Sequence, residues 1–147
     1  MVRRSSGRLN PDFDTFECMK EIIIEGSRIH DIAGFYQEIN RIFMKDEDWQ
    51  LGQTLDGFND LLFGGFGLLK SDEPVTLIWK DFALSKAALG FEVTRQYYLS
   101  KIAPDSPFDK PYFRRQLADL KAGHGKTYFD IIMEIIAEHR NIRLIEK

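Results

Sequence analysis

Three short apolar runs stand out along the chain, at 20–26, 73–79 and 141–147. Runs of this length, bounded by polar or turn residues, are typical of strands buried in a parallel sheet. The stretches between them are much longer than the roughly dozen residues that a parallel crossover connection needs. We therefore predict an α/β protein with a small three-stranded parallel sheet packed with helices.

The segments between these runs have apolar residues at steps of three and four, which is the spacing of amphipathic helices. The clearest begins at Asp31, whose side chain can cap it. A shorter helix is expected over 54–64, with Thr54 as its cap and Gly64 as its stop. Further helices are predicted over 80–89 and 93–102, from Pro111 as a first helical position, and after Gly125.

The length of 147 residues suits one domain, and the 44% of apolar residues suits a folded one. Residues 1–19 show no clear periodicity, and we interpret them as an N-terminal arm. We expect residues 20–147 to form a single domain. No signal-peptide pattern is visible, and no apolar run approaches the roughly 18 residues of a membrane span. We therefore expect a cytoplasmic protein without a membrane partner.

Residues that could carry catalysis or bind a metal are few and scattered. The single cysteine, Cys18, excludes an internal disulfide and favours a reducing compartment. His30, His124 and His139 lack the spacing of metal ligands. All three fall near predicted helix ends, where surface histidines are ordinary. We expect no metal site, no cofactor and no enzymatic activity.

The segment GHGKT, at 123–127, resembles the end of a phosphate-binding loop. That motif needs a glycine five positions before Gly125, where this chain has Leu120. It also needs a strand directly before the loop, whereas the pattern predicts a helix there. We interpret the segment as the glycine-rich start of the last helix and expect no nucleotide site.

Charge is spread unevenly along the chain. Residues 45–73 hold seven acids and two bases, whereas residues 92–126 hold four acids and seven bases. The basic segment also carries Tyr97, Tyr98, Tyr112 and Phe113. Basic and aromatic side chains together can bind nucleic acid. The net charge of −3 favours instead a solvated basic face with its rings packed inward, without direct nucleic-acid binding.

Two carboxylates share one face of the helix expected at 54–64. Asp56 and Asp60 are four residues apart, and like charges at this spacing destabilise a helix by roughly 0.2–0.5 kcal/mol. The helix dipole favours Asp56 in the first turn, but not Asp60. On the last helix Asp130, Glu134 and Glu138 also align at steps of four. These residues are either solvated acids, as on most helices, or a site that needs negative charge.

The order of these motifs resembles the barstar family, the cytoplasmic inhibitors of barnase-type ribonucleases. The resemblance covers about 20–86 and 127–146. It rests on the first strand with Gly26, on the acidic helix with its two aspartates, and on the closing Ala-Glu pair and strand. The segment after the second strand matches the family pattern W-x-x-F-x-x-S-K through Trp79, Phe82, Ser85 and Lys86.

This resemblance implies a barstar-like fold and an immunity or antitoxin protein that inhibits a ribonuclease or nuclease toxin. Family members insert an acidic helix and the loop before it into the basic active site of the enzyme. Carried over to this chain, the partner-binding residues would be Asp56, Asp60, Asn59, Glu134, Trp49 and Gln53. The arm at 1–19 and a helical insertion at about 88–125 have no counterpart in the family.

Two other functions stay open at this point, because the aromatic contacts of the family are changed. Gln50 and Leu51 replace a tyrosine pair, and Asn59 replaces a tryptophan. The first alternative is a barstar-fold scaffold without inhibition, whose basic segment at 92–126 contacts another protein or RNA. The second is a small hydrolase that uses Asp56, Asp60 and Glu134 for acid–base chemistry.

Overall fold

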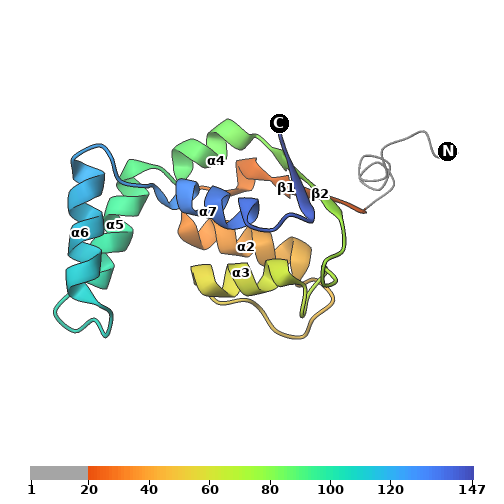
Figure 1. The fold of residues 1–147 in the computed structure, drawn as a ribbon, viewed down its shortest axis with the longest axis horizontal. Helices are drawn as coiled ribbons and strands as arrows, with labels where there is room; N and C mark the ends of the chain where they lie inside the picture. The colour runs from red at the N-terminus through yellow and green to blue at the C-terminus, as the bar shows by residue number, and fades with distance from the viewer. Residues whose placement is uncertain (1–19) are drawn as a thin grey trace, which may run out of the picture.

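A computed structural model describes residues 20–147, so the arm expected at 1–19, with Cys18, lies outside the described residues. The described part is an α/β fold whose strands and helices follow the order that the sequence predicts (Figure 1). The elements are β1 (Lys20–Glu25), the 3-10 turn η1 (Gly26–Arg28), α2 (Ile32–Phe43), α3 (Leu55–Phe63), β2 (Val75–Lys80), α4 (Phe82–Ala88), α5 (Phe91–Lys101), α6 (Lys110–Lys121), α7 (Tyr128–Ala137) and β3 (Ile142–Glu146).

The three strands form one parallel sheet in the order β1-β2-β3, with β2 in the centre. Ile22 of β1 pairs with Leu77 of β2, which pairs in turn with Leu144 of β3. Trp79 of the central strand is completely buried. The sheet confirms the prediction of a small three-stranded parallel sheet packed with helices.

One continuous core joins the helices to the central strand. Figure 1 shows α2 and α3 on one side of the sheet, and α4 follows the end of β2 and packs against η1. The Phe35 ring of α2 stacks on Trp79 with 6.2 Å between centroids, and Phe58 of α3 meets Phe35 edge-on at 5.3 Å. Phe129 of α7 meets Trp79 at 5.6 Å. Both acidic helices are therefore anchored to the sheet through aromatic rings.

The helix signals predicted from the sequence have the expected geometry. The Asp31 carboxylate accepts a hydrogen bond from the Gly34 amide at 2.7 Å, and the Thr54 hydroxyl accepts one from the Gly57 amide at 3.0 Å. Gly64 ends α3 in the left-handed region at φ 85°, a conformation that glycine adopts without strain. The short helix α3 is therefore held at both ends, which fixes the direction of its side chains.

The segment at about 88–125 forms mainly a hairpin of two helices, α5 and α6, which pack on each other. Figure 1 shows this hairpin standing across the end of the molecule where α3 and α7 begin. It has a small core of its own, made of Tyr98, Leu117 and Leu120. Pro111 is the second residue of α6 rather than the first, because the Asp109 side chain caps the helix from one position earlier.

Candidate functional site

The acids of α3 face solvent on a helix whose other face is buried. Phe58, Leu61 and Leu62 are almost completely buried in the core, whereas Asp56 and Asp60 are exposed. Within residues 20–147, no ion pair involves either aspartate. The helix therefore presents two carboxylates from a rigid support, and no cation of the described residues relieves the repulsion between them.

Glu134, the third acid expected in the site, lies on α7 beside the start of α3. It lines the same pocket as Leu55, the first residue of α3. Its carboxylate accepts a hydrogen bond from Lys126 Nζ at 3.0 Å, and its side chain is 53% exposed. Asp130 has a local role instead, since its carboxylate completes a capping box with Thr127 at the start of α7. Of this row, Glu134 is the acid that lines a pocket together with the first residue of α3.

Asn59 is tied to the molecule by an internal hydrogen bond. Its Oδ1 lies 2.7 Å from His139 Nε2, and with this oxygen as acceptor the imidazole donates. His139 is only 6% exposed, so the expectation of a surface histidine at this position is wrong. The residue follows α7 and fills the space between α7 and α3, and its burial lowers its pKa. Asn59 therefore has one fixed orientation in the acidic face.

Aromatic side chains surround the far end of α3. Trp49 is 44% exposed and packs on Phe66 with 4.9 Å between ring centroids. Phe63 is 61% exposed and lies edge-on to His139 at 4.6 Å. Phe66 lies in the glycine-rich turn after α3, where its packing against Trp49 depends on long-range folding that no local pattern signals.

The loop before α3 is held in place by the α2 side chain of Asn40. The Asn40 amide donates to the Leu51 carbonyl at 3.1 Å, and its Oδ1 accepts from the Leu51 amide at 2.7 Å. Gln53, further along the loop, is exposed and lines a groove of about 480 Å³ with residues of α5 such as Val93 and Tyr97. The structure therefore places Trp49 and Gln53 on two sides of the acidic helix rather than next to each other.

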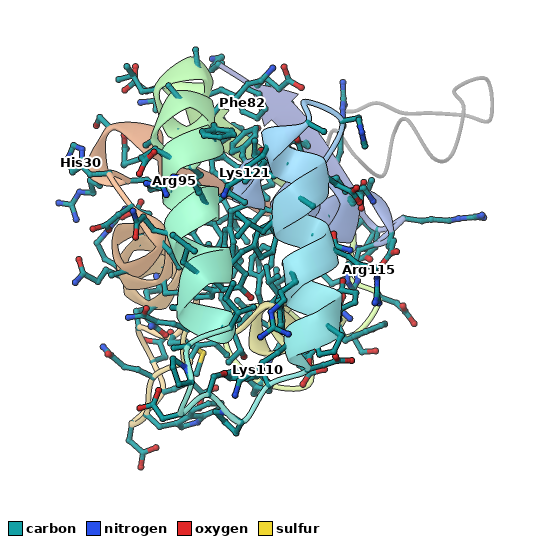
Figure 2. All side chains as sticks on the ribbon, turned by 90° about the vertical axis from the view of Figure 1, so that its left-hand side faces the viewer. His30, Phe82, Arg95, Lys110, Arg115 and Lys121 are labelled. Carbon is teal, nitrogen blue, oxygen red and sulfur yellow. The ribbon has the colours of Figure 1, made fainter. Side chains whose placement is uncertain are left out.

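Part of the basic charge of 92–126 is engaged by contacts within the molecule. Arg95 pairs with Glu92 at 2.6 Å, Lys126 pairs with Glu134, and the Lys101 ammonium lies 3.8 Å from the centre of the Phe108 ring. In the part of the chain that the structure describes, Arg114, Arg115 and Lys121 form no ion pair. Figure 2 shows Arg115 on the side of α6 that faces away from Arg95 of α5. Few cations remain for a nucleic-acid groove.

The expectation that the aromatic rings of this segment pack inward is right for some and wrong for others. Tyr98 is buried, and Tyr97 and Phe113 are half-buried. Tyr112 and Phe108, however, are exposed over nearly half of their surface. A hairpin of two helices has only one internal seam, so it cannot bury rings on every side. Tyr112 is left at the surface, near the mouth of a pocket.

This pocket, of about 400 Å³, separates the hairpin from the two acidic helices. Its lining comes from four elements and includes Leu55, Tyr97, Tyr112, Phe113, Asp119 and Glu134. It was not foreseen from the sequence, because its walls are distant along the chain. No periodicity links Leu55 to a helix that begins more than fifty residues later. The acidic face is consequently bordered on one side by a concave, aromatic wall.

The segment GHGKT connects α6 to α7, and a helix precedes it as the sequence predicts. A side chain at Gly125 would place its Cβ 2.5 Å from the Leu120 amide nitrogen, so glycine is needed to close this turn. Lys126 is engaged with Glu134. Among residues 20–147, no group of three His, Cys, Asp or Glu side chains is arranged to hold a metal ion. None of the described helices combines the length and apolar character that a membrane span requires.

Comparison with known proteins adds no assignment, since no family model matches the chain and no curated protein is similar to it.

Proposed function

We propose that this chain is a barstar-like protein inhibitor, of the immunity or antitoxin type, that blocks the basic active site of a ribonuclease or nuclease toxin. The observation that carries the proposal is the pair Asp56 and Asp60, which are exposed and have no counterion among residues 20–147, on a helix that is capped and anchored in the core. Two carboxylates that repel each other in the free protein are both stabilised when a partner supplies cations next to them.

The physical basis is imitation of the phosphate backbone. The active site of a ribonuclease holds phosphates with arginine, lysine and histidine side chains. Two carboxylates one helical turn apart can pair with those cations, and a rigid helix loses little entropy when it binds. The negative face also attracts a basic enzyme over distance, which speeds encounter at low salt.

The surroundings of the acids suit a protein interface. Exposed aromatic side chains, which are enriched in such interfaces, lie near the acids at Phe63, the last residue of α3, and at Trp49, in the loop before it. Glu134 adds a third carboxylate from the neighbouring helix. The competing function, a scaffold that binds RNA through 92–126, is less well supported because most cations of that segment are engaged internally.

The proposal is tested by inhibition of a panel of small secreted ribonucleases and nuclease toxin domains. The wild-type chain is compared with Asp56→Ala/Asp60→Ala, in about 0.05 M and about 0.5 M salt. We expect the wild type to inhibit at least one enzyme, less strongly at high salt. The double variant should lose at least about a hundredfold in inhibition.

A matched control removes two exposed acids away from the acidic helices, Glu21→Ala/Asp105→Ala. Its net charge equals that of the test variant, so it separates a specific contact from general electrostatic attraction. Equal losses in the two variants would contradict a site on α3. Absence of inhibition across the panel, with binding of RNA to the wild type, would replace this proposal by the scaffold function.

A further inference from the structure

The pocket between the hairpin and the acidic helices has aromatic walls. Tyr98 and Phe113 lie 6.1 Å apart between ring centroids, and Tyr112 meets Phe113 edge-on at 5.0 Å. Tyr97 adds a fourth ring, which packs against both Tyr98 and Phe113. All four rings line the same space of about 400 Å³. Such a group of rings, rigid and partly exposed, offers π faces and edges to an incoming side chain.

The lining of this pocket carries more carboxylates than cations, and the Arg115 guanidinium lies outside the lining, 6.0 Å from the centre of the Tyr112 ring. Asp119 and Glu134 contribute carboxylates to the lining, against the single ammonium of Lys126. That ammonium already lies on the Glu134 carboxylate at 2.9 Å, so the molecule itself places a cation at the pocket's rim. The hydrogen bond to Glu134 raises the pKa of Lys126. Burial, followed by the charges of Tyr112 and Asp56, raises the pKa of Tyr97.

We propose that this pocket receives a cationic side chain of the partner protein, with arginine as the best fit. A guanidinium group can stack on tyrosine and phenylalanine rings while it donates to carboxylates such as Asp119. Lysine offers only a point charge to the same groups. The occupant is thus a protruding arginine, and α5–α6 is a second contact arm that selects partners carrying one.

The inference rests on the proposed function in one respect, because it takes the partner to be the protein that binds α3. The pocket begins at Leu55, next to Asp56, so one partner surface can cover both. The hairpin thereby adds a second contact surface beside the acidic face. A nuclease without an arginine at the matching place would still meet Asp56 and Asp60 but would leave the pocket empty.

The pocket can be tested without any nuclease. Arginine amide is titrated into the full chain, and the aromatic signals of Tyr97, Tyr112 and Phe113 are followed by NMR. Citrulline amide, which has the same shape without the charge, is the matched probe. We expect saturable shifts with arginine amide and at least about fivefold weaker binding of citrulline amide. Phenylalanine amide, a probe for an apolar occupant, should bind more weakly still.

Two single variants with the same change of charge complete the test. Asp119→Asn removes a carboxylate of the lining, and Asp105→Asn removes an exposed one from the loop between α5 and α6. Asp119→Asn should weaken the binding of arginine amide severalfold, and Asp105→Asn should leave this binding unchanged. Equal binding of the charged and neutral probes, or equal effects of the two variants, would overturn the inference.

The outcome is independent of the inhibition test. The Asp60→Asn variant, whose acid lies outside the pocket lining, should retain arginine amide binding while it loses inhibition. Loss of inhibition in that variant, together with no binding of arginine amide to the wild type, would refute the pocket and leave the proposed function intact. Binding of arginine amide without inhibition of any nuclease would refute the function and leave the pocket as a cation site.

Discussion

The indole nitrogen of Trp79 donates a hydrogen bond to the Ser85 hydroxyl at 2.9 Å, and both residues are completely buried. The same hydroxyl donates to the Gly26 carbonyl at 3.1 Å. The end of β2, the helix α4 and the turn after β1 are thus joined at one point. A Cβ at Gly26 would lie 2.2 Å from the Lys80 carbonyl oxygen, so only glycine fits there. Three of the residues on which the resemblance to the barstar family rests, Gly26, Trp79 and Ser85, therefore hold the fold rather than a partner.

Replacement of Ser85 by alanine should lower the free energy of unfolding by about 1–3 kcal/mol, because it leaves the Trp79 indole N–H buried without an acceptor. Urea unfolding followed by tryptophan fluorescence measures the change. Ser71→Ala, at an exposed position, is the control and should change stability by less than about 0.5 kcal/mol. Equal effects of the two variants would show that the indole has found another partner.

The order and type of the elements follow from local chemistry, and this explains why they were predictable. Apolar runs mark the strands. Asp31 and Thr54 cap the starts of their helices and Gly64 ends one, each through contacts within three or four residues. Asp56 and Asp60 were placed on the outer face of α3 for the same reason, since helical spacing fixes the side on which they lie. Local rules therefore predict the acids of the candidate site.

The remainder of the site depends on contacts between distant segments. His139 comes from the turn before β3, yet it is buried against Asn59, a residue 80 positions earlier. The pairing of Trp49 with Phe66 and the pocket beside α3 are of the same kind. Periodicity carries no information on which loop covers which helix. The exposure of Tyr112 could not be predicted, because the hairpin forms only a small core of its own and the sequence pattern does not show how many rings this core can bury.

The buried hydroxyls of Tyr36 and Tyr128 lie 2.7 Å apart and link α2 to α7. Burial raises the pKa of Tyr36 to about 12 and that of Tyr128 further, so both stay neutral in ordinary buffers. Tyr36→Phe and Tyr128→Phe should each lower the free energy of unfolding by about 1–2 kcal/mol, because the remaining hydroxyl loses its buried partner. The double variant should cost less than the sum of the two. Chemical denaturation of all four proteins gives the coupling energy, and strict additivity would contradict a direct bond.

Stability should depend on pH through His139. Burial, opposed in part by the negative charge of Glu138, lowers its pKa below that of a free histidine, about 6.5. The unfolded chain then binds a proton more readily than the folded one, so this group's contribution is present above about pH 6.5 and is lost as the pH falls. His139→Gln should lower the free energy of unfolding by about 1–2 kcal/mol at pH 7.5, because the hydrogen bond to Asn59 is weakened.

The measurement compares thermal unfolding of wild type and variant at about pH 7.5 and about pH 5.5. Stability of the wild type should fall more between these values than that of His139→Gln. His30→Gln, an exposed position, should behave like the wild type at both. A fall in stability of the same size in both histidine variants would assign the pH dependence to other groups.

Removal of charge from α3 should stabilise the free protein while it weakens the complex. Asp60→Asn relieves the repulsion with Asp56 and changes helix propensity little. The free energy of unfolding should therefore rise by roughly 0.2–0.5 kcal/mol. Asp56→Asn relieves the same repulsion but loses a favourable interaction with the helix dipole, so its net gain should be smaller or absent. Urea unfolding of the three proteins, with about 0.05 M and about 0.5 M salt, tests this, since screening should shrink the gain of Asp60→Asn. Under the proposed function this repulsion in the free protein is offset in the complex, where the partner's cations pair with both carboxylates. If Asp60→Asn were instead destabilising, the carboxylate would have a structural role, and the case for a binding site on α3 would fail.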